Sequence, residues 1–328
     1  MSQKPSNTWS MLFFTYSTLW LFAMVALIFG GLSDRFLTLD NVVNILIQSS
    51  SLGIIATGMT FVLLTAGIDL SVGSIMFLSA VVVGKIVLGD YPLPLAFGAA
   101  ILIGAAYGAL NGLMVTRFKI LPFIVTLATL YLGRGLGLYL SETRAMNLPE
   151  NLLQIGSARL FGVIPLPIVF LVLALAIAHY LLTMTPFGRQ IYAIGNDIDA
   201  AQKAGINTSR VLFVVYVLCG LFAAIGGLVA VAQMGSVAPK FGDQREFAAI
   251  SAAVLGGTSL FGGRGSVIPG TLLGAVLIQT IDNGLVIVNA NPYIYPMVTS
   301  SVIFLAVLID TKRNTYMAQL KRKKIRVD

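Results

Sequence analysis

Apolar stretches of about twenty residues recur along almost the whole chain, and they restrict its possible folds more than any single motif does. The first runs from Met11 to Gly31, which is long enough as a helix to cross roughly 30 Å of hydrocarbon at about 1.5 Å per residue. A secretory signal would have a shorter apolar core and a small-residue cleavage site, and neither is evident. We therefore expect a first transmembrane helix that is retained.

Composition places the chain in the same class. It is 57% hydrophobic and 10% charged, whereas soluble domains carry about 25% charged residues, so water would meet large apolar patches on its surface. The formal charge of +8 is not gathered into a basic patch with interleaved aromatics, so we expect no nucleic-acid partner. The single cysteine, Cys219, excludes a disulfide within the chain and a cysteine metal cluster. We expect no cofactor, no metal and no catalytic residues.

The hydropathy pattern predicts an all-α integral membrane protein with about ten transmembrane helices, forming one polytopic membrane domain over residues 1–328. The expected spans are 10–31, 42–66, 70–88, 93–116, 120–141, 163–184, 210–233, 247–261, 267–288 and 293–310. The segment 247–261 is short and rich in Gly and Ala, which is typical of a broken or re-entrant helix. Lys and Arg are concentrated in the segments on one side and in the basic tail 311–328, so both termini are predicted to be cytoplasmic.

Polar residues within the spans allow two interpretations. Ser50, Thr57 and Thr60 share one face of the second span, close to Gln48, and such a stripe either joins helices or lines a hydrated path. Asp282 and Asn283 also lie within a span. They are further candidates for the translocation path, because charges at membrane depth are costly and usually functional or paired.

Arg134 lies near the middle of its span, and Asp282 could pair with it or meet a polar solute. So few buried acids argue against an ion-driven porter. The loop from Gly257 to Ser266 resembles a phosphate loop only superficially, because it lacks the lysine of that motif. The energy for any active transport must therefore come from another polypeptide.

The longest internal hydrophilic segment is the loop 185–210, which the charge pattern places in the cytoplasm. Pro186 can begin a short helix, and the stretch from Asp199 to Ala204 is predicted to be helical. A plain connection between helices is usually 2–8 residues long. The extra length favours a short helix that lies along the membrane and docks into a soluble partner.

Three stretches give the chain a family resemblance. They are Gly67-Ile68-Asp69-Leu70-Ser71-Val72-Gly73-Ser74; Phe187-Gly188-Arg189 through Ala193-Ile194-Gly195-Asn196 and Ala200-Ala201 to Gly205-Ile206; and Ala253-Val254-Leu255-Gly256-Gly257 with Gly262-Gly263-Arg264-Gly265-Ser266. With these stretches and its span pattern, the chain resembles the permease subunits of the ribose/xylose/arabinose-type ABC sugar importers, within the branched-chain-type permease superfamily.

The resemblance implies a subunit of the prokaryotic cytoplasmic membrane, surrounded by lipid, that moves a pentose or hexose. Its implied partners are a second permease copy (identical or paralogous), a cytoplasmic ATP-binding subunit and an extracytoplasmic sugar-binding protein. The residues implied for coupling to the ATPase are Arg189, Asn196, Ala200, Ala201 and Gly205. Those implied at the cytoplasmic mouth are Gly67, Asp69, Ser71 and Gly73.

Several alternatives stay open at this point. The same family includes importers of sugar-like solutes such as autoinducer-2 or a polyol. A branched-chain amino-acid permease belongs to the same superfamily, although the Gly67–Ser74 stretch favours sugars. An ion-coupled secondary sugar porter would work alone, and the long loop 185–210 argues against it. A membrane scaffold that transports nothing has no positive support.

Overall fold

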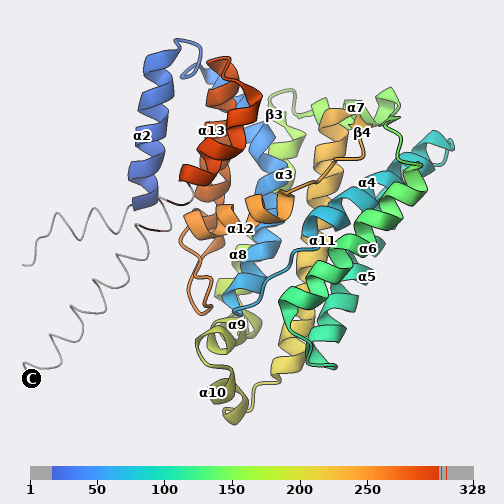
Figure 1. Ribbon diagram of the computed structural model, residues 1–328, viewed down its shortest axis with the longest axis vertical. Helices are drawn as coiled ribbons and strands as arrows, with labels where there is room; N and C mark the ends of the chain where they lie inside the picture. Colours follow the sequence, from blue (N-terminus) through green and yellow to red (C-terminus); the bar gives the residue numbers. More distant parts are fainter. Residues whose placement is uncertain (1–16, 303, 305–307, 309–328) are drawn as a thin grey trace, which may run out of the picture. The chain divides into compact units, whose positions relative to one another are not determined.

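The computed structural model describes residues 17–302, 304 and 308, and this part of the chain is almost entirely helical (Figure 1). The longer helices are α2 (Ser17–Leu32), α3 (Leu39–Leu64), α4 (Val72–Leu88), α5 (Leu93–Thr116), α6 (Pro122–Ser141), α8 (Leu166–Met184), α11 (Thr208–Met234) and α13 (Leu272–Ile287). The shorter ones are α7 (Glu150–Ser157), α9 (Pro186–Asn196), α10 (Ile198–Lys203), α12 (Arg245–Leu255), the kinked turn η1 (Val267–Thr271) and the turn η2 (Pro292–Ile294).

The strands are two residues long and form two antiparallel pairs. β1 (Met146–Asn147) pairs with β4 (Ser236–Val237), and β2 (Arg159–Leu160) pairs with β3 (Ile164–Pro165). The all-helical membrane class predicted from hydropathy is therefore confirmed.

Within the described residues, six helical segments are long and apolar enough to cross a bilayer. They are α3, α5, α6, α8, α11 and the continuous segment Val267–Ile287. The apolar helices Thr18–Leu32 and Val72–Leu88 are shorter. The chain is thus a multi-pass membrane protein, while the count of ten spans and the cytoplasmic termini stay predictions. The basic tail 311–328 and the first 16 residues lie outside the described part.

The chain divides into two compact units, one formed by residues 1–45 with 277–328 and the other by residues 46–276. In the larger unit α11 is central, because it packs along α5, α4 and α7. A Cβ at Gly104 of α5 would strike the carbonyl of Gly220 in α11, and one at Gly220 would strike that of Gly104. Small residues at such a crossing let two backbones approach closely where apolar burial alone gives little drive for association.

Two stretches of the larger unit that connect helices are irregular. α3 ends at Leu64, residues 65–71 are not helical, and α4 then begins at Val72. Similarly, β4 leads through a loop into the eleven-residue α12, and residues 256–266 form turns before η1. The expected helix over 247–261 therefore ends at Leu255, as the Gly256-Gly257 pair at its end favours.

The smaller unit is held by aromatic and amide contacts. The rings of Phe29 and Phe36 lie 5.4 Å apart, and a Cβ at Gly284 of α13 would collide with the Phe29 ring. Asn41 and Asn283 exchange two side-chain hydrogen bonds of 2.9 and 3.0 Å. α2 therefore packs closely on the second half of α13. The predicted single domain over 1–328 stays a prediction.

Candidate functional site

The loop between α3 and α4 carries a buried carboxylate. Asp69 is fully buried, and its Oδ1 accepts hydrogen bonds from the Ser71 backbone N at 2.9 Å and the Ser71 Oγ at 2.6 Å. The loop thus forms a self-bonded turn immediately before the first residue of α4.

Two neighbouring helices complete a polar chain around this turn. Asn111 of α5 donates from Nδ2 to Ser71 Oγ at 2.8 Å, and Thr129 of α6 donates from Oγ1 to Asn111 Oδ1 at 2.8 Å. All four side chains, including Asp69, are buried. We call Asp69, Ser71, Asn111 and Thr129 the polar chain. Since buried polar groups are costly unless they are paired, it joins the loop to α5 and α6 in one arrangement.

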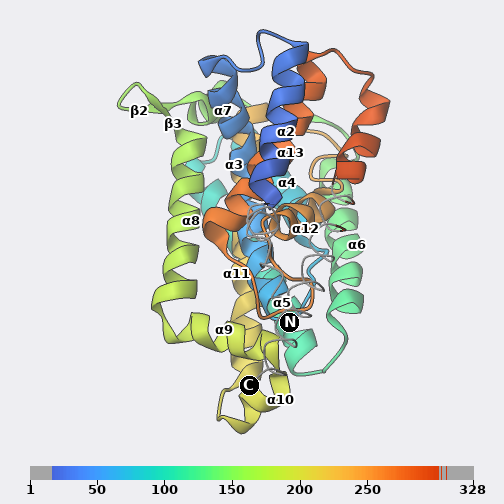
Figure 2. The same cartoon turned by 90° about the vertical axis from the view of Figure 1, so that its left-hand side faces the viewer.

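The segment predicted to dock into a partner folds as two short helices. Thr185 caps α9 by accepting from Gly188 N at 3.3 Å, and Asp197 caps α10 by accepting from the backbone N of Ala200 at 3.0 Å. Gly205 follows α10 with φ +83°, a conformation that glycine adopts without steric cost. Figure 2 shows both helices at one end of the larger unit, with α9 lying across the direction of α8.

The residues predicted for coupling differ in exposure. Arg189, Asn196, Ala200 and Gly205 are exposed, whereas Ala201 is buried. The exposed residues are available to a partner surface. Ala201 instead holds α10 in place, and its carbonyl accepts from Ile206 N at 3.1 Å.

The inner side of α9 packs on the other two stretches. A Cβ at Gly195 would collide with the carbonyl of Leu64, the last residue of α3. Gly263 donates its backbone N to the same carbonyl at 2.9 Å, and Tyr192 of α9 donates its hydroxyl to the carbonyl of Gly265 at 2.9 Å. α9 therefore packs against the end of α3 and against the segment that follows α12.

The residues predicted for the mouth and the path occupy different surroundings. Gly67, Asp69, Ser71 and Gly73 are all buried. Ser50, Thr57 and Thr60 are also fully buried, and each donates its hydroxyl to a backbone carbonyl four residues earlier in α3.

The remaining path candidates belong to both units. Gln48 is exposed in the larger unit. In the smaller unit, Asp282 Oδ1 accepts from Thr299 Oγ1 at 3.3 Å, and Asn283 pairs with Asn41. Their roles in a mouth or a path stay predictions.

Sequence reasoning missed Asn111, Thr129 and Glu246. Asn111 lies in a largely apolar span. A single amide side chain within a span indicates a paired or functional residue, so the sequence did contain a signal for Asn111. Thr129 resembles any helix threonine, because its local pattern does not reveal the partner on α5. Glu246 lies just outside the span expected to begin at residue 247, so it was not treated as a charge at membrane depth.

A cavity of about 330 Å³ lies between α5, α7, α8 and α11. It is lined by Phe97, Ile101, Ile155, Gly156, Pro167, Phe170, Ile225, Leu228, Val229 and Ala232. No charged or hydroxyl side chain contributes to its lining, so it offers a polar solute no side-chain hydrogen bond. We do not assign it to the candidate site.

Comparison with known proteins agrees with this architecture. A family model described as branched-chain amino acid transport system / permease component matches residues 41–309. The chain is 44% identical over 301 residues to the ribose import permease protein RbsC of Bacillus subtilis (strain 168), which covers 90% of this chain and 91% of that protein. It is 39% identical over 298 residues to RbsC of Escherichia coli (strain K12), covering 89% and 92% of the two chains.

A third relative, the D-allose transport system permease protein AlsC of Escherichia coli (strain K12), is 36% identical over 312 residues, covering 94% and 95% of the two chains. No solved structure matches the chain. The predicted resemblance to sugar-import permeases is confirmed by these relatives. Because the family model spans most of the chain, the protein belongs to the family of branched-chain amino acid transport system permease components.

Proposed function

We propose that this chain is the membrane-spanning subunit of an ATP-binding cassette importer that moves a monosaccharide. The observation that carries the proposal is the identity with ribose and D-allose permeases over about nine-tenths of the chain. The subunit translocates and does not catalyse, and ATP hydrolysis belongs to a cytoplasmic partner. In a prokaryote it resides in the cytoplasmic membrane with both termini inside.

The partner ATPase docks on α9 and α10. Their exposed residues Arg189, Asn196, Ala200 and Gly205 supply the surface. ATP-driven closure of the ATPase moves α9, and the backbone contacts of Gly195 and Gly263 with Leu64 transmit the movement to α3 and to the segment after α12. A second permease subunit forms the other half of the pore, and an extracytoplasmic binding protein delivers the sugar.

The test is reconstitution of the chain with its ATPase and a sugar-loaded binding protein in proteoliposomes. We expect ribose, allose or fructose on the binding protein to stimulate ATP hydrolysis and to be accumulated in the vesicles. Uptake by this chain alone under an ion gradient, with no stimulation of ATP hydrolysis by any sugar, would refute the proposal and indicate a secondary porter.

A matched pair of variants locates the docking surface. Gly205 and Gly162 both have positive φ, +83° and +74°, and a Cβ at either meets nothing within 4 Å. Gly205→Asp therefore changes the docking surface, and Gly162→Asp makes the same chemical change in the β2–β3 turn. We expect Gly205→Asp to lose co-purification with the ATPase subunit while Gly162→Asp keeps it. Equal retention by both variants would place the ATPase elsewhere.

One relative favours a second substrate class. The autoinducer 2 import system permease protein LsrC of Photorhabdus luminescens is 32% identical over 308 residues, which is 92% of each chain. The identity with the ribose permeases is higher, so a monosaccharide is the first proposal. The same reconstitution decides between them when autoinducer-2 is included among the solutes.

A further inference from the structure

Two helices of the larger unit begin against each other. Gly73 is the second residue of α4, and Glu246 is the second residue of α12. A Cβ at Gly73 would collide with Glu246 Oε2, and one at Gly242 would lie 2.6 Å from the Gly73 carbonyl. Only a residue without a side chain fits at Gly73. The N-termini of α4 and α12 therefore meet, and we call this meeting point the helix junction.

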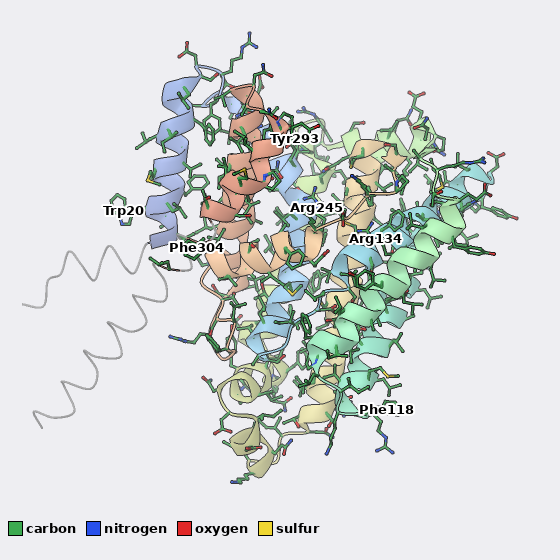
Figure 3. The ribbon with its side chains drawn as sticks, in the orientation of Figure 1. Trp20, Phe118, Arg134, Arg245, Tyr293 and Phe304 are labelled. Atoms are coloured by element: carbon green, nitrogen blue, oxygen red, sulfur yellow. The ribbon has the colours of Figure 1, made fainter. Side chains whose placement is uncertain are left out.

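Charged groups surround the helix junction. Arg134 of α6 donates from Nη1 to the Phe241 carbonyl at 2.7 Å, and its Nη2 lies 3.7 Å from Asp243 Oδ1. Its guanidinium also covers the Phe77 ring, with Cζ 4.9 Å from the ring centroid. Arg134 is thereby fixed from three directions. Figure 3 shows Arg134 on α6 and Arg245 at the start of α12.

We place this cluster at membrane depth, because Arg134 belongs to a candidate span. Arg134 is the thirteenth residue of the twenty in α6, a candidate span, so it lies roughly 18 Å and 10 Å from the two helix ends at about 1.5 Å per residue. The Asp243 side chain is nevertheless 56% exposed. A half-exposed carboxylate at this depth must face a water-filled cavity or a polar partner, because lipid cannot solvate it.

One carboxylate oxygen at the helix junction has no hydrogen-bond partner among the described residues. It is Oε2 of Glu246, a residue that is only 6% exposed. Buried polar atoms in native proteins are nearly always paired. The backbone N–H groups of a helix's first turn also lack partners within their helix. The helix junction thus places a buried carboxylate oxygen without a described partner beside the first turns of two helices.

We infer that the helix junction, with Arg134, Asp243 and Glu246, is the point in each permease where the passing sugar is hydrogen-bonded. The inference rests on the proposed function and names the site that function uses. Half-helices that begin within a membrane are a general means of placing backbone donors beside a polar solute.

The mixture of hydrogen-bond donors and acceptors favours a neutral ligand with many hydroxyl groups. Two carboxylates accept hydrogen bonds from hydroxyls, while Arg134 and the two helix N-termini donate to oxygens. Each helix N-terminus carries the equivalent of roughly half a positive charge, and Arg245 at the start of α12 adds a further cation, so charges of both signs lie side by side at the helix junction. An anion would meet two carboxylates, and a cation would meet the guanidinium. A monosaccharide satisfies donors and acceptors together.

The first experiment removes one hydroxyl from the sugar and one carboxylate from the protein. Uptake at saturating loaded binding protein is measured for ribose, allose, fructose and their monodeoxy derivatives, with wild type, Glu246→Gln and Asp243→Asn. In wild type, we expect at least one monodeoxy sugar to be taken up about tenfold more slowly than its parent sugar, as for a lost hydrogen bond to a charged group. In the variant that lacks the matching carboxylate, the same comparison should give a difference of less than about threefold. Equal slowing in wild type and variants for every sugar would overturn the inference.

The second experiment tests access from water and does not depend on transport. The only cysteine, Cys219, is buried, so the native chain supplies the labelling background. Asp243→Cys in the assembled importer should react with a charged thiol reagent, and loaded binding protein with trapped nucleotide should slow the reaction. The control is Leu102→Cys, at a 69% exposed apolar position in the middle of α5, which should not react.

The outcomes of the two experiments separate the proposals. No ATP-driven sugar uptake by wild type would refute the proposed function. ATP-driven sugar uptake by wild type, together with an Asp243→Cys variant that does not react with the thiol reagent, would refute the helix junction as the sugar site. If Glu246→Gln does not fold, the exposed Asp243→Asn and the labelling of Asp243→Cys still decide the question.

Discussion

Replacing Ser71 by alanine tests the polar chain most directly. The Ser71 hydroxyl donates to Asp69 at 2.6 Å and accepts from Asn111 at 2.8 Å. Ser71→Ala removes both bonds and leaves the Asn111 amide with a buried donor that has lost its acceptor. Two hydrogen bonds at about 0.5–1.5 kcal/mol each, plus a stranded buried donor at about 1–3 kcal/mol, give a loss of about 4 kcal/mol.

Ser79→Ala is the matched control, because Ser79 is also fully buried and lies on α4, where its hydroxyl meets only the Ala100 carbonyl at 3.5 Å. It should cost less than about 1 kcal/mol. The free energy of unfolding of both purified variants is measured by denaturant titration in one detergent. Ser71→Ala should shift the folding equilibrium at least about thirtyfold more than Ser79→Ala. Equal shifts would show that the polar chain does not stabilise the loop.

Three further predictions concern backbone packing and accessibility. In Gly195→Ala, the new Cβ should collide with the Leu64 carbonyl and lower the free energy of unfolding by about 1–3 kcal/mol. Gly98→Ala in α5 is the control, because a Cβ there meets nothing within 4 Å, and it should be neutral or stabilising. Equal effects of the two substitutions would contradict the packing of α9. Gly205→Val should weaken ATPase co-purification while Gly205→Asn retains most of it, because asparagine tolerates positive φ and, unlike aspartate, adds no charge to the docking surface; identical binding would refute this. Cys219 should react with a thiol dye only on unfolding, so rapid labelling of the native chain would contradict its burial.

Local patterns sufficed for much of the protein. Hydropathy alone predicted helices over α3, α5, α6, α8 and α11, because each is as long as an apolar run and needs no distant partner for its backbone hydrogen bonds. Pro186 likewise predicted the start of a short helix within the loop 185–210, and the stretch from Asp199 to Ala204 was predicted to be helical. The Gly-Ala composition near 247–261 predicted an interruption there, and the helix does end at Leu255.

The same patterns could not predict which side chains meet. From the sequence, Asp282 is a candidate partner of Arg134, and this stays a prediction; the structure places Asp243 Oδ1 3.7 Å from Arg134 Nη2, a contact that no local pattern predicts. Ser50, Thr57 and Thr60 were predicted to join helices or line a path. The structure shows their hydroxyls bonded within α3 itself, with Thr60 also 2.7 Å from Thr271.

The sequence by itself determined the membrane class, the helical periods and the stretches where helices are interrupted, because these depend on neighbouring residues and on the cost of exposing backbone to lipid. Only the tertiary structure decided that Ser71, Asn111 and Thr129 form one polar chain and that Gly73 meets Glu246. These residues are far apart along the chain. Their contacts depend on how separate helices cross, which no local periodicity encodes.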